Sequence, residues 1–286
     1  MDISKYEILY VGKVRNVYKI NEHKLLLNAT DKISGFNKHI CNIKNKGKLL
    51  NLMSIFWFEK TNHIINNHLI SYDKELSPQN IVVHNCRPFK IEVVVRGYIT
   101  GNTETSLWTH YNNGIRNYCG ITFPDGLVKN QKLEYPVVTP TTKDDADKPI
   151  SPKEIIDKGY MTKEQMDYIF KKALELYNFG ATYSETKGLI LVDTKYEFGL
   201  DNHNNIILID ELHTCDSSRY WLKDTYESKF KQKVNPDKLD KDQIRDWVKS
   251  KCDPYNEVIP MPPNEIINKV YNTYNDFYKM LTKDDI

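Results

Sequence analysis

The 286-residue chain lacks the features that mark a membrane or exported protein. Its apolar runs are all shorter than the roughly 20 residues that a membrane-spanning helix needs. The first ten residues, MDISKYEILY, contain neither a basic region followed by an apolar run nor a signal-peptide cleavage site. We therefore expect a soluble, cytoplasmic protein with no membrane partner.

Cysteine is scarce, and the familiar catalytic and metal-binding motifs are missing. The five cysteines form no Cys-x-x-Cys pair, and their odd number indicates reduced thiols. His213 and Cys215 form a close His/Cys pair, which by itself is weak evidence for zinc. There is no His-Glu-x-x-His segment and no Gly-x-Ser-x-Gly segment. The sequence thus gives no support for a zinc enzyme or a serine hydrolase.

No excess of one charge is present either. Lysine and arginine total 40 and aspartate and glutamate total 38, so the net charge is only +2. A nucleic-acid-binding protein is expected to be far more basic, and we therefore expect no nucleic-acid partner. Hydrophobic residues make up 40% and aromatic residues 12% of the chain, which is enough to build a substantial core.

The pattern of apolar residues predicts a chain whose first third is rich in antiparallel strands. Short alternating runs predict strands over residues 7–11, 14–20, 24–29, 81–84 and 91–95, with a buried helix over residues 48–68. From about residue 103 to 149 glycine and proline interrupt the pattern. This stretch also carries Trp108, Tyr111, Tyr118 and Phe123, so we expect an ordered, functional region rather than disorder.

Helices dominate the second half, on either side of a predicted hairpin. Ser151 with Glu154, and Thr162 with Gln165, have the spacing of capping boxes at helix starts. Two more helices are predicted, over residues 240–251 and after Pro263; one face of the last carries Ile266, Ile267, Val270, Tyr274, Phe277 and Leu281. We therefore predict an α+β fold with two lobes around a cleft, a β-rich lobe of residues 1–102 and a mixed lobe of residues 103–286 with a helical C-terminal segment.

The predicted hairpin, Leu189 to Ile209, gathers charges at one end. Asp193, Lys195 and Glu197 alternate with apolar residues and should share one face of the strand, and the return strand ends at Asp210. A half-buried hairpin also has a charged face toward water, and this interpretation stays open. The alternative is a magnesium–phosphate site, because Mg²⁺ prefers one or two carboxylates together with water and phosphate oxygens.

Three further segments combine cations with residues suited to binding anions. Gly12-Lys13 forms a tight turn with Arg15 two residues on, and Arg96 ends an apolar strand just before two glycines. In the segment CDSSRYW, Ser218 and Arg219 suit a phosphomonoester, although Asp216 or a serine there would equally suit a helix N-cap. Each segment could also be an ordinary polar turn.

Taken in order, these segments resemble the SAICAR synthetase (phosphoribosylaminoimidazole-succinocarboxamide synthase) family. The matching segments are YVGKVRNVY, TDKISGFN, NIKNKGKLLN, IFWF, VVVRGYITGN, TPTTK, GLILVDTKYEFG and DELHTCDSSRYW, and they extend over most of the chain. One such segment has little specificity, but eight in the same order are highly specific. The resemblance implies a two-lobed, protein-kinase-like fold whose first lobe binds the nucleotide.

The resemblance also implies a reaction and a set of site residues. L-aspartate would be joined to the carboxylate of carboxyaminoimidazole ribonucleotide (CAIR), with ATP cleaved to ADP and phosphate and Mg²⁺ as cofactor. Gly12, Lys13 and Arg15 would contact the ATP phosphates, Glu197 and Asp210 would hold Mg²⁺, and Lys195 would lie between nucleotide and substrate. The remaining substrate contacts would come from Arg96, Asn102, Lys143, Asp147, Ser218 and Arg219.

The chain departs from the family pattern at Asn37, Asn102 and Ala146, where aspartate, serine and histidine are common. An ATP-dependent small-molecule kinase of related fold, of the inositol-phosphate type, is the alternative function. Such a kinase should lack the TPTTK and DSSR segments, which favours the ligase. The sequence leaves the oligomeric state open.

Overall fold

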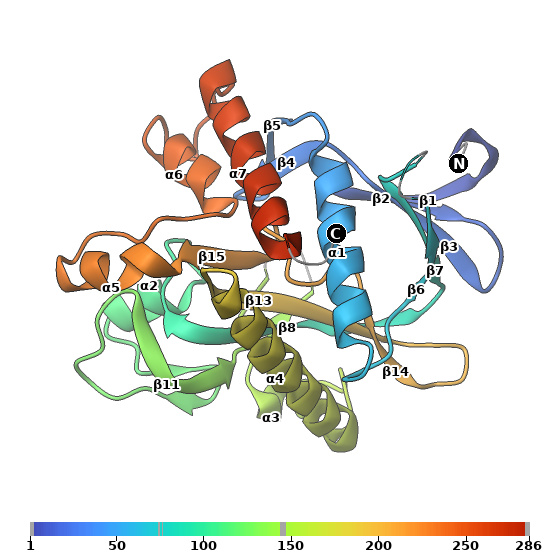
Figure 1. Ribbon diagram of the computed structural model, residues 1–286. Coiled ribbons are helices and arrows are strands. Elements are labelled where there is room, and N and C mark those ends of the chain that lie inside the picture. The colour runs from blue at the N-terminus through green and yellow to red at the C-terminus, as the bar shows by residue number, and fades with distance from the viewer. Residues whose placement is uncertain (1–2, 74, 76, 144–146, 284–286) are drawn as a thin grey trace.

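The structure, a computed structural model, describes residues 3–73, 75, 77–143 and 147–283. It has the predicted α+β class, with antiparallel sheets covered by helices (Figure 1).

A short 3-10 helix, Ile3–Lys5, precedes the strands β1 (Glu7–Val11), β2 (Arg15–Lys19), β3 (Lys24–Ala29), β4 (Lys32–Gly35), β5 (Lys38–Asn42), β6 (Leu69–Tyr72), β7 (Asn80–His84), β8 (Arg87–Ile99), β9 (Asn117–Tyr118), β10 (Ile121–Thr122), β11 (Gln131–Val138), β12 (Thr141–Thr142), β13 (Leu189–Leu200), β14 (Ile206–Ile209) and β15 (Ser218–Leu222). The helices are α1 (Lys46–Thr61), α2 (Leu107–Asn112), α3 (Pro152–Asp157), α4 (Lys163–Thr186), α5 (Lys223–Lys231), α6 (Asp242–Lys249) and α7 (Asn264–Thr282).

None of the helices in these ranges is both long enough and apolar enough to cross a membrane.

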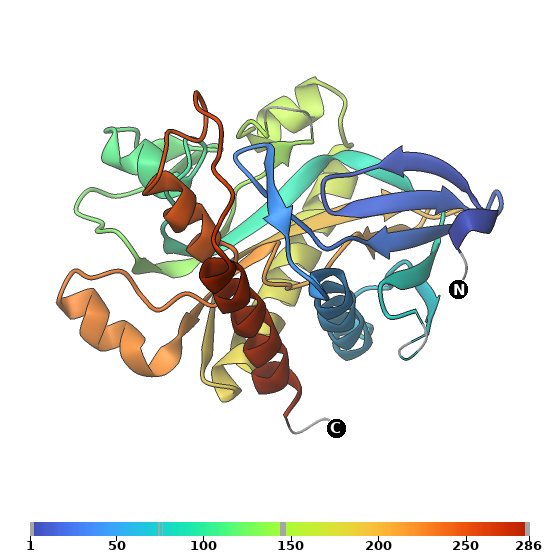
Figure 2. The ribbon, with the colours of Figure 1, turned by 90° about the horizontal axis from the view of Figure 1, so that it is seen from above.

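The first sheet has five strands in the order β1-β2-β3-β7-β6, all antiparallel. It lies at one end of the molecule (Figure 2). The predicted strands over residues 7–11 and 24–29 are found unchanged as β1 and β3. Strand β2 is one residue shorter than predicted at each end, and β7 begins one residue earlier than predicted. The Gly12-Lys13 turn joins β1 to β2, where the Gly12 N–H donates to the carbonyl of Arg15 at 2.9 Å. The hairpin β4–β5, which the sequence did not predict, follows this sheet's first three strands.

Helix α1 is shorter than predicted, ending at Thr61 rather than at residue 68. Its apolar residues are buried on nearly every side, which explains why the sequence shows no clear amphipathic period. After the helix the chain runs beside β14. The His68 N–H donates to the carbonyl of Leu208, and the Leu208 N–H donates to that of Asn66, each at 3.0 Å. Pairing with the sheet edge therefore replaces the last helical turns.

The second sheet is the centre of the molecule. Its strands run in the order β11-β8-β13-β14, with β12 paired to β8 and β15 paired to β13. Strand β8 is 13 residues long and extends the predicted strand 91–95 at both ends, because it pairs with β11, β12 and β13. The division of the chain into lobes at residue 102 stays a prediction. Residues of β8, from the first predicted lobe, form a ladder with β13 of the second, with one shift of register between Glu197 and Gly199.

The hairpin β13–β14 is confirmed, but the alternation of side chains along β13 is interrupted once. Leu191 pairs with Tyr220 and Asp193 pairs with Arg219, so Val192 is an extra residue in the ladder with β15. This is a β-bulge, which shifts the alternation by one position. Leu189 and Leu191 therefore pack in the same core as Tyr196 and Phe198, while Val192 packs in a separate cluster. The charged face still carries Asp193, Lys195 and Glu197 together.

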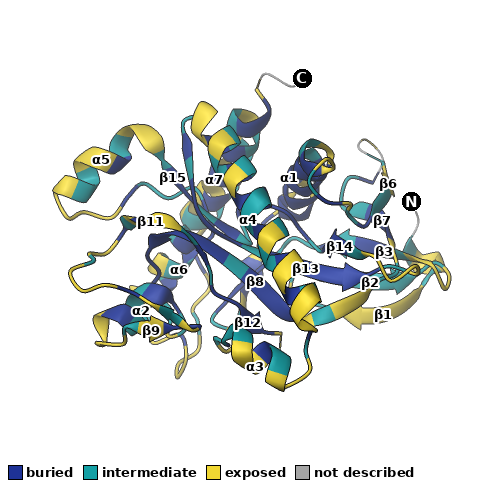
Figure 3. Cartoon of the chain, turned by 90° about the horizontal axis from the view of Figure 1, so that it is seen from below, coloured by how far each residue is buried: buried dark blue, intermediate teal, exposed yellow. Residues whose placement is uncertain are grey.

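Helix α4 covers the apolar face of β8 and β13. Both predicted capping boxes are present, Ser151 with Glu154 at α3 and Thr162 with Gln165 at α4. Figure 3 shows β8 and β13 in the colour of buried residues beneath α4, whose outer face is exposed. Helix α7 lies beside α1, and the predicted apolar residues of α7, including Phe277, belong to the same core. The core thus continues from the second sheet to both helices.

The helix N-cap interpretation of Asp216, Ser217 and Ser218 is wrong. Ser218 already begins β15, and α5 starts only at Lys223 after the cap residue Leu222. Pairing with β13 holds this segment extended, and the apolar residues Tyr220 and Trp221 are buried on its two faces. The expectation that residues 103–149 are ordered rather than disordered is confirmed for the part of this stretch that the structure describes. Tyr111, Tyr118 and Phe123 form a small core with Ile99 of β8.

Candidate active site

The hairpin β13–β14 places the two predicted metal carboxylates next to each other in the sheet. Glu197 pairs directly with Ile209, the last residue of β14, and Asp210 is the next residue after Ile209. Asp210 has φ +67°, in the left-handed region where a residue other than glycine loses on the order of 1 kcal/mol. The chain turns sharply at this point, and such local strain is typical of functional sites.

Cations surround these carboxylates. We call the carboxylates Glu92, Glu197, Asp210 and Glu211, together with Arg15, Lys143 and Lys195, the carboxylate cluster. Arg15 on β2 donates to Asp210 at 2.9 Å, and a second nitrogen of the same guanidinium lies 3.2 Å from Glu211. Lys143 donates to Glu197. Lys195 donates to Glu92 at 2.6 Å and lies 3.9 Å from Glu197. Glu92 and Glu197 are directly opposite on β8 and β13, so the two lysines offset the repulsion of a like-charged cross-strand pair.

Neighbouring charges separate the proton affinities of the two carboxylates. Burial and the neighbouring Asp210 raise the pKa of Glu197 from an ordinary 4.5 to about 7. Burial alone would also raise the pKa of Asp210, but Arg15, Lys195 and Lys143 outweigh it and hold that pKa below its ordinary range. The repulsion between the two carboxylates therefore appears as the raised pKa of Glu197, while Asp210 stays ionised. A cation placed between the two carboxylates would relieve it.

A second group of charges, the arginine cavity, lies beside the carboxylate cluster. One carboxylate oxygen of Asp193 accepts from Arg96 at 3.1 Å and from Arg219 at 2.7 Å. Arg219 also donates to Asp242 at 3.0 Å, and Arg245 donates to the other oxygen of Asp242 at 2.9 Å. These side chains line a cavity of 250 Å³ that Lys195 also lines. Its cations suit a phosphate, and Lys195 connects it to the carboxylate cluster.

The structure adds site residues that the sequence did not single out. Lys46, which is fully buried, donates to Asp216 at 2.7 Å, and Lys241 lies 3.6 Å from the same carboxylate. Burial lowers the pKa of Lys241 to about 8, although Asp216 opposes the shift. Lys241 and Arg245 are four residues apart and so share one face at the start of α6. The spacing of Lys241 and Arg245 could have indicated in the sequence that both side chains face the site. The burial of Glu92 on β8 had no such signal in the sequence.

Other predicted residues lie around these two groups. Lys13 donates to the amide oxygen of Asn37 at 2.9 Å. Asn37, which replaces the aspartate common in the family, therefore gives Lys13 a neutral partner. The Ser218 hydroxyl donates to Thr194 at 2.8 Å. The Asn102 side chain donates to Asp246 at 3.0 Å on α6. Asp147 lines the arginine cavity, whereas Ala146, the third departure, lies outside the described residues.

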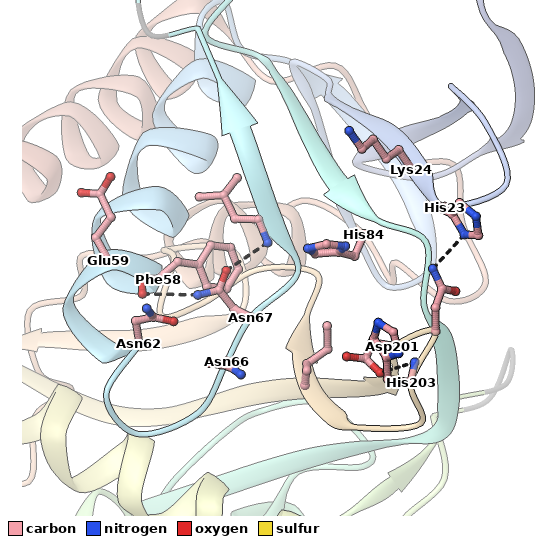
Figure 4. A pocket seen from close by; sticks show the side chains of 13 residues that line it. His23, Lys24, Phe58, Glu59, Asn62, Asn66, Asn67, His84, Asp201 and His203 are labelled. Atoms are coloured by element: carbon pink, nitrogen blue, oxygen red, sulfur yellow. Dashed lines mark hydrogen bonds between the residues drawn. The ribbon is translucent and has the colours of Figure 1, made fainter.

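A larger cavity, of 690 Å³, lies elsewhere, between the end of α1, residues 66–69 and the β13–β14 turn (Figure 4). His84 projects into it, and a hydrogen bond of 3.0 Å between Asn202 and His23 closes one side. Among the described residues, none of those predicted for the site lines this cavity. Chemistry rather than size therefore identifies the arginine cavity and the carboxylate cluster as the candidate active site.

A largely buried carboxylate pair beside a cavity lined by arginines suits an enzyme that acts on nucleotides or other phosphate-bearing substrates. Comparison with known proteins is more specific. The sequence profile of the SAICAR synthetase family matches residues 8–262. The phosphoribosylaminoimidazole-succinocarboxamide synthase of Legionella pneumophila (strain Paris) is 48% identical over 275 residues, which are 96% of this chain and 87% of that protein.

Two solved structures have the same fold. SAICAR synthase from Saccharomyces cerevisiae, complexed with SAICAR, is 31% identical with a TM-score of 0.83, and the match covers 98% of this chain and 95% of that one. A SAICAR synthetase (Type-2) in complex with ADP is 25% identical with a TM-score of 0.73, covering 97% and 98%. The chain therefore belongs to the SAICAR synthetase family, whose members are ligases of purine biosynthesis. The predicted family and enzyme class are confirmed.

The opposite pKa shifts of the two carboxylates predict opposite pH dependence of stability. Because the pKa of Glu197 is raised in the folded state, its ionisation lowers the free energy of unfolding as pH rises from about 4.5 to 7. The variant Glu197→Gln should therefore gain stability relative to wild type between pH 5 and pH 8. Because the pKa of Asp210 is lowered, its contribution is present at neutral pH and lost in acid. Asp210→Asn should lose stability at pH 8 and approach wild type as pH falls.

Thermal melting of the three proteins at several pH values measures both effects. If the two variants change the melting temperature at pH 8 in the same direction, the assigned pKa shifts are wrong.

Proposed function

We propose that this chain joins the amine of L-aspartate to the carboxylate of CAIR and cleaves ATP to ADP and phosphate. The names of its relatives, and the SAICAR and ADP in two of the similar structures, support this reaction. The observation that carries the proposal is the position of Lys195. Its ammonium group contacts the carboxylate cluster and lines the arginine cavity, so it lies between a site for a metal-bound nucleotide and a site for a phosphate ester.

The reaction needs the two sites side by side. A carboxylate is a poor acyl donor until one of its oxygens becomes a leaving group. Transfer of the γ-phosphoryl group from ATP to a CAIR carboxylate oxygen would break the bond to ADP and give an acyl phosphate. The aspartate amine would then attack the carbonyl carbon, phosphate would leave, and the amine would lose a proton. Lys195 would neutralise negative charge on the groups that pass between the two sites.

On the nucleotide side, Gly12, Lys13 and Arg15 would contact the ATP phosphates. The turn at Gly12 is tight, because a Cβ atom on this residue would lie 2.3 Å from the carbonyl oxygen of Arg15. The backbone can therefore approach a phosphate closely there. Arg15 is held by Asp210 and Glu211, which fixes its guanidinium beside the metal carboxylates. It would keep part of this pairing when the phosphates arrive.

Glu197 and Asp210 fit a magnesium ion. No cluster of three or more acidic, histidine or cysteine ligands occurs in the described ranges. ATP-bound Mg²⁺ needs fewer, because one or two carboxylates commonly suffice when phosphates and waters complete the coordination. Burial, and after it repulsion from Asp210, raise the pKa of Glu197 to about 7, and a divalent cation would offset that repulsion. Bound there, Mg²⁺ would neutralise the polyphosphate as charge moves toward ADP.

The arginine cavity would hold CAIR by its phosphate. Arg96 and Arg219 share one carboxylate oxygen of Asp193, so their guanidinium groups are held close together. Forked donors of this kind bind phosphate in two-point contacts that lysine cannot reproduce. Asn102, Ser218, Lys143 and Asp147 would complete the substrate contacts. The kinase alternative is not favoured, because the similarity to SAICAR synthetases extends over nearly the whole chain.

Substrate dependence tests the reaction. We expect ADP release to require CAIR and L-aspartate together, and to be weak with L-glutamate, whose extra methylene would displace its amine from the carbonyl carbon. A coupled assay for ADP, with each substrate omitted in turn, measures this. Turnover of inositol phosphates, or no turnover with CAIR, would contradict the proposal.

Replacing each metal carboxylate by its amide tests the magnesium site. Glu197→Gln and Asp210→Asn should each lower kcat by ~10²–10³-fold, as expected for loss of one preorganised electrostatic contact. Each should also reduce the rise in melting temperature that MgCl₂ produces in the presence of ADP, a readout that does not depend on turnover. Asp237→Asn is the matched control, because Asp237 accepts from Lys229 and Thr225 outside both groups. Normal magnesium-dependent stabilisation in both site variants would exclude these ligands.

A further inference from the structure

The ladder between β8 and β13 stops at the arginine cavity. The paired residues run from Arg87 and Leu200 to Arg96 and Asp193, and these two fully described strands form no further pair with each other beyond that point. At the same point β13 carries the bulge at Val192, in its ladder with β15. The two strands therefore separate just beyond Asp193, the residue that holds Arg96 and Arg219 together.

The hydroxyl of Tyr177, from α4, fills the opening between the strands. It donates to the carbonyl oxygen of Leu191 at 2.8 Å and lies 3.3 Å from that of Val192. Only 3% of the Tyr177 side chain is exposed, and burial raises its pKa well above the ordinary value, so the hydroxyl keeps its proton. Leu191 and Val192 have no pairing partner on β8, and a buried carbonyl beside such a gap needs another donor.

Gly97, the residue after Arg96, makes room for this hydroxyl. A Cβ atom on Gly97 would lie 2.0 Å from the Tyr177 oxygen and 3.0 Å from the ring carbon that carries it. A side chain there would therefore displace the ring. Three features coincide at one place: the end of the β8–β13 ladder, the bulge at Val192 and a glycine that admits a tyrosine hydroxyl.

The bulge decides which way Asp193 faces. Leu191 packs in the apolar core on the α4 side of the sheet. Without the extra residue, strict alternation would direct Asp193 to that same side, where a carboxylate would be buried among apolar groups at large cost. With the bulge, Asp193 lies on the opposite face between the two arginines. A contact that stabilises the bulge therefore controls the spacing of the Arg96 and Arg219 guanidinium groups.

We propose that Tyr177 is a positioning residue for the phosphate-bearing substrate: by holding the bulge of β13, it sets Asp193 and through it the two arginines of the arginine cavity. The assignment of the substrate rests on the function proposed above. Tyr177 itself touches no substrate and takes part in no proton transfer. Its effect should appear in binding of the phosphate ester and leave nucleotide binding unchanged.

Removing the hydroxyl tests the proposal. The loss of one net hydrogen bond at the bulge should raise the KM for CAIR in Tyr177→Phe by roughly three- to ten-fold. The KM for ATP should stay unchanged and kcat should stay within about two-fold. Tyr111→Phe is the matched control, because Tyr111 is equally buried and donates to the carbonyl of Pro124 at 2.8 Å, away from both sites. It should lower the melting temperature without changing the KM for CAIR.

A second variant tests whether Gly97 and Tyr177 act together. Gly97→Ala should raise the KM for CAIR more than Tyr177→Phe does, because its methyl group displaces the ring. Adding Tyr177→Phe to Gly97→Ala removes the closest clash, so the double variant should bind CAIR better than Gly97→Ala alone. Simple additivity of the two effects would overturn the coupling, and with it the proposed contact.

An unchanged KM for CAIR in Tyr177→Phe, with active wild type, would show that Tyr177 is only structural. Should the wild type lack CAIR- and aspartate-dependent ADP release, the proposed function fails, but the inference keeps its own test. Stabilisation by inorganic phosphate, measured by thermal melting, should then be weaker in Tyr177→Phe than in wild type and Tyr111→Phe. Equal stabilisation of all three would overturn it.

Discussion

Neutralisation of buried charge is the constraint on which the rest of the site depends. Burying a charge is costly unless an opposite charge and hydrogen bonds compensate it. At the second sheet, Asp193 lies between Arg96 and Arg219, and Asp210 accepts from Arg15. These contacts connect β2, β8, β13 and β15, so the ion pairs fix the first sheet against the second. The same pairs hold the cations in place before any ligand binds.

These ion pairs also explain how the site can accept anions without rearranging the fold. Each arginine in the cavity contacts a carboxylate through only some of its five N–H donors, which leaves others for a phosphate. The carboxylate pair is less well compensated, since Glu197 has a pKa of about 7 beside Asp210. Uncompensated negative charge thus lies at the proposed metal site, whereas the lining of the arginine cavity combines five basic with six acidic side chains. A metal ion would complete the compensation that the protein leaves unfinished at the carboxylate pair.

Local patterns in the sequence predicted much of this arrangement. Strand β3, both capping boxes and the apolar face of α7 depend on neighbouring residues alone. The family resemblance, now confirmed, supplied the reaction and the expected roles of Arg15, Glu197 and Arg219, which stay predictions. The end of α1, the bulge at Val192 and the burial of Glu92 and Lys46 could not be predicted, because each depends on segments far away in the chain. Likewise, the N-cap interpretation of Ser218 failed because pairing with β13 is a long-range interaction.

The central claim is that Glu197 and Asp210 together hold a divalent cation at the nucleotide. The most direct test is a crystal structure with Mn²⁺ and ADP, because anomalous scattering locates manganese independently of the coordinates. We predict a manganese peak in contact with a carboxylate oxygen of Glu197 and one of Asp210, with an ADP phosphate completing the coordination. A peak bound by phosphate alone, with Glu197 still paired to Lys143 and Asp210 still paired only to Arg15, would contradict it.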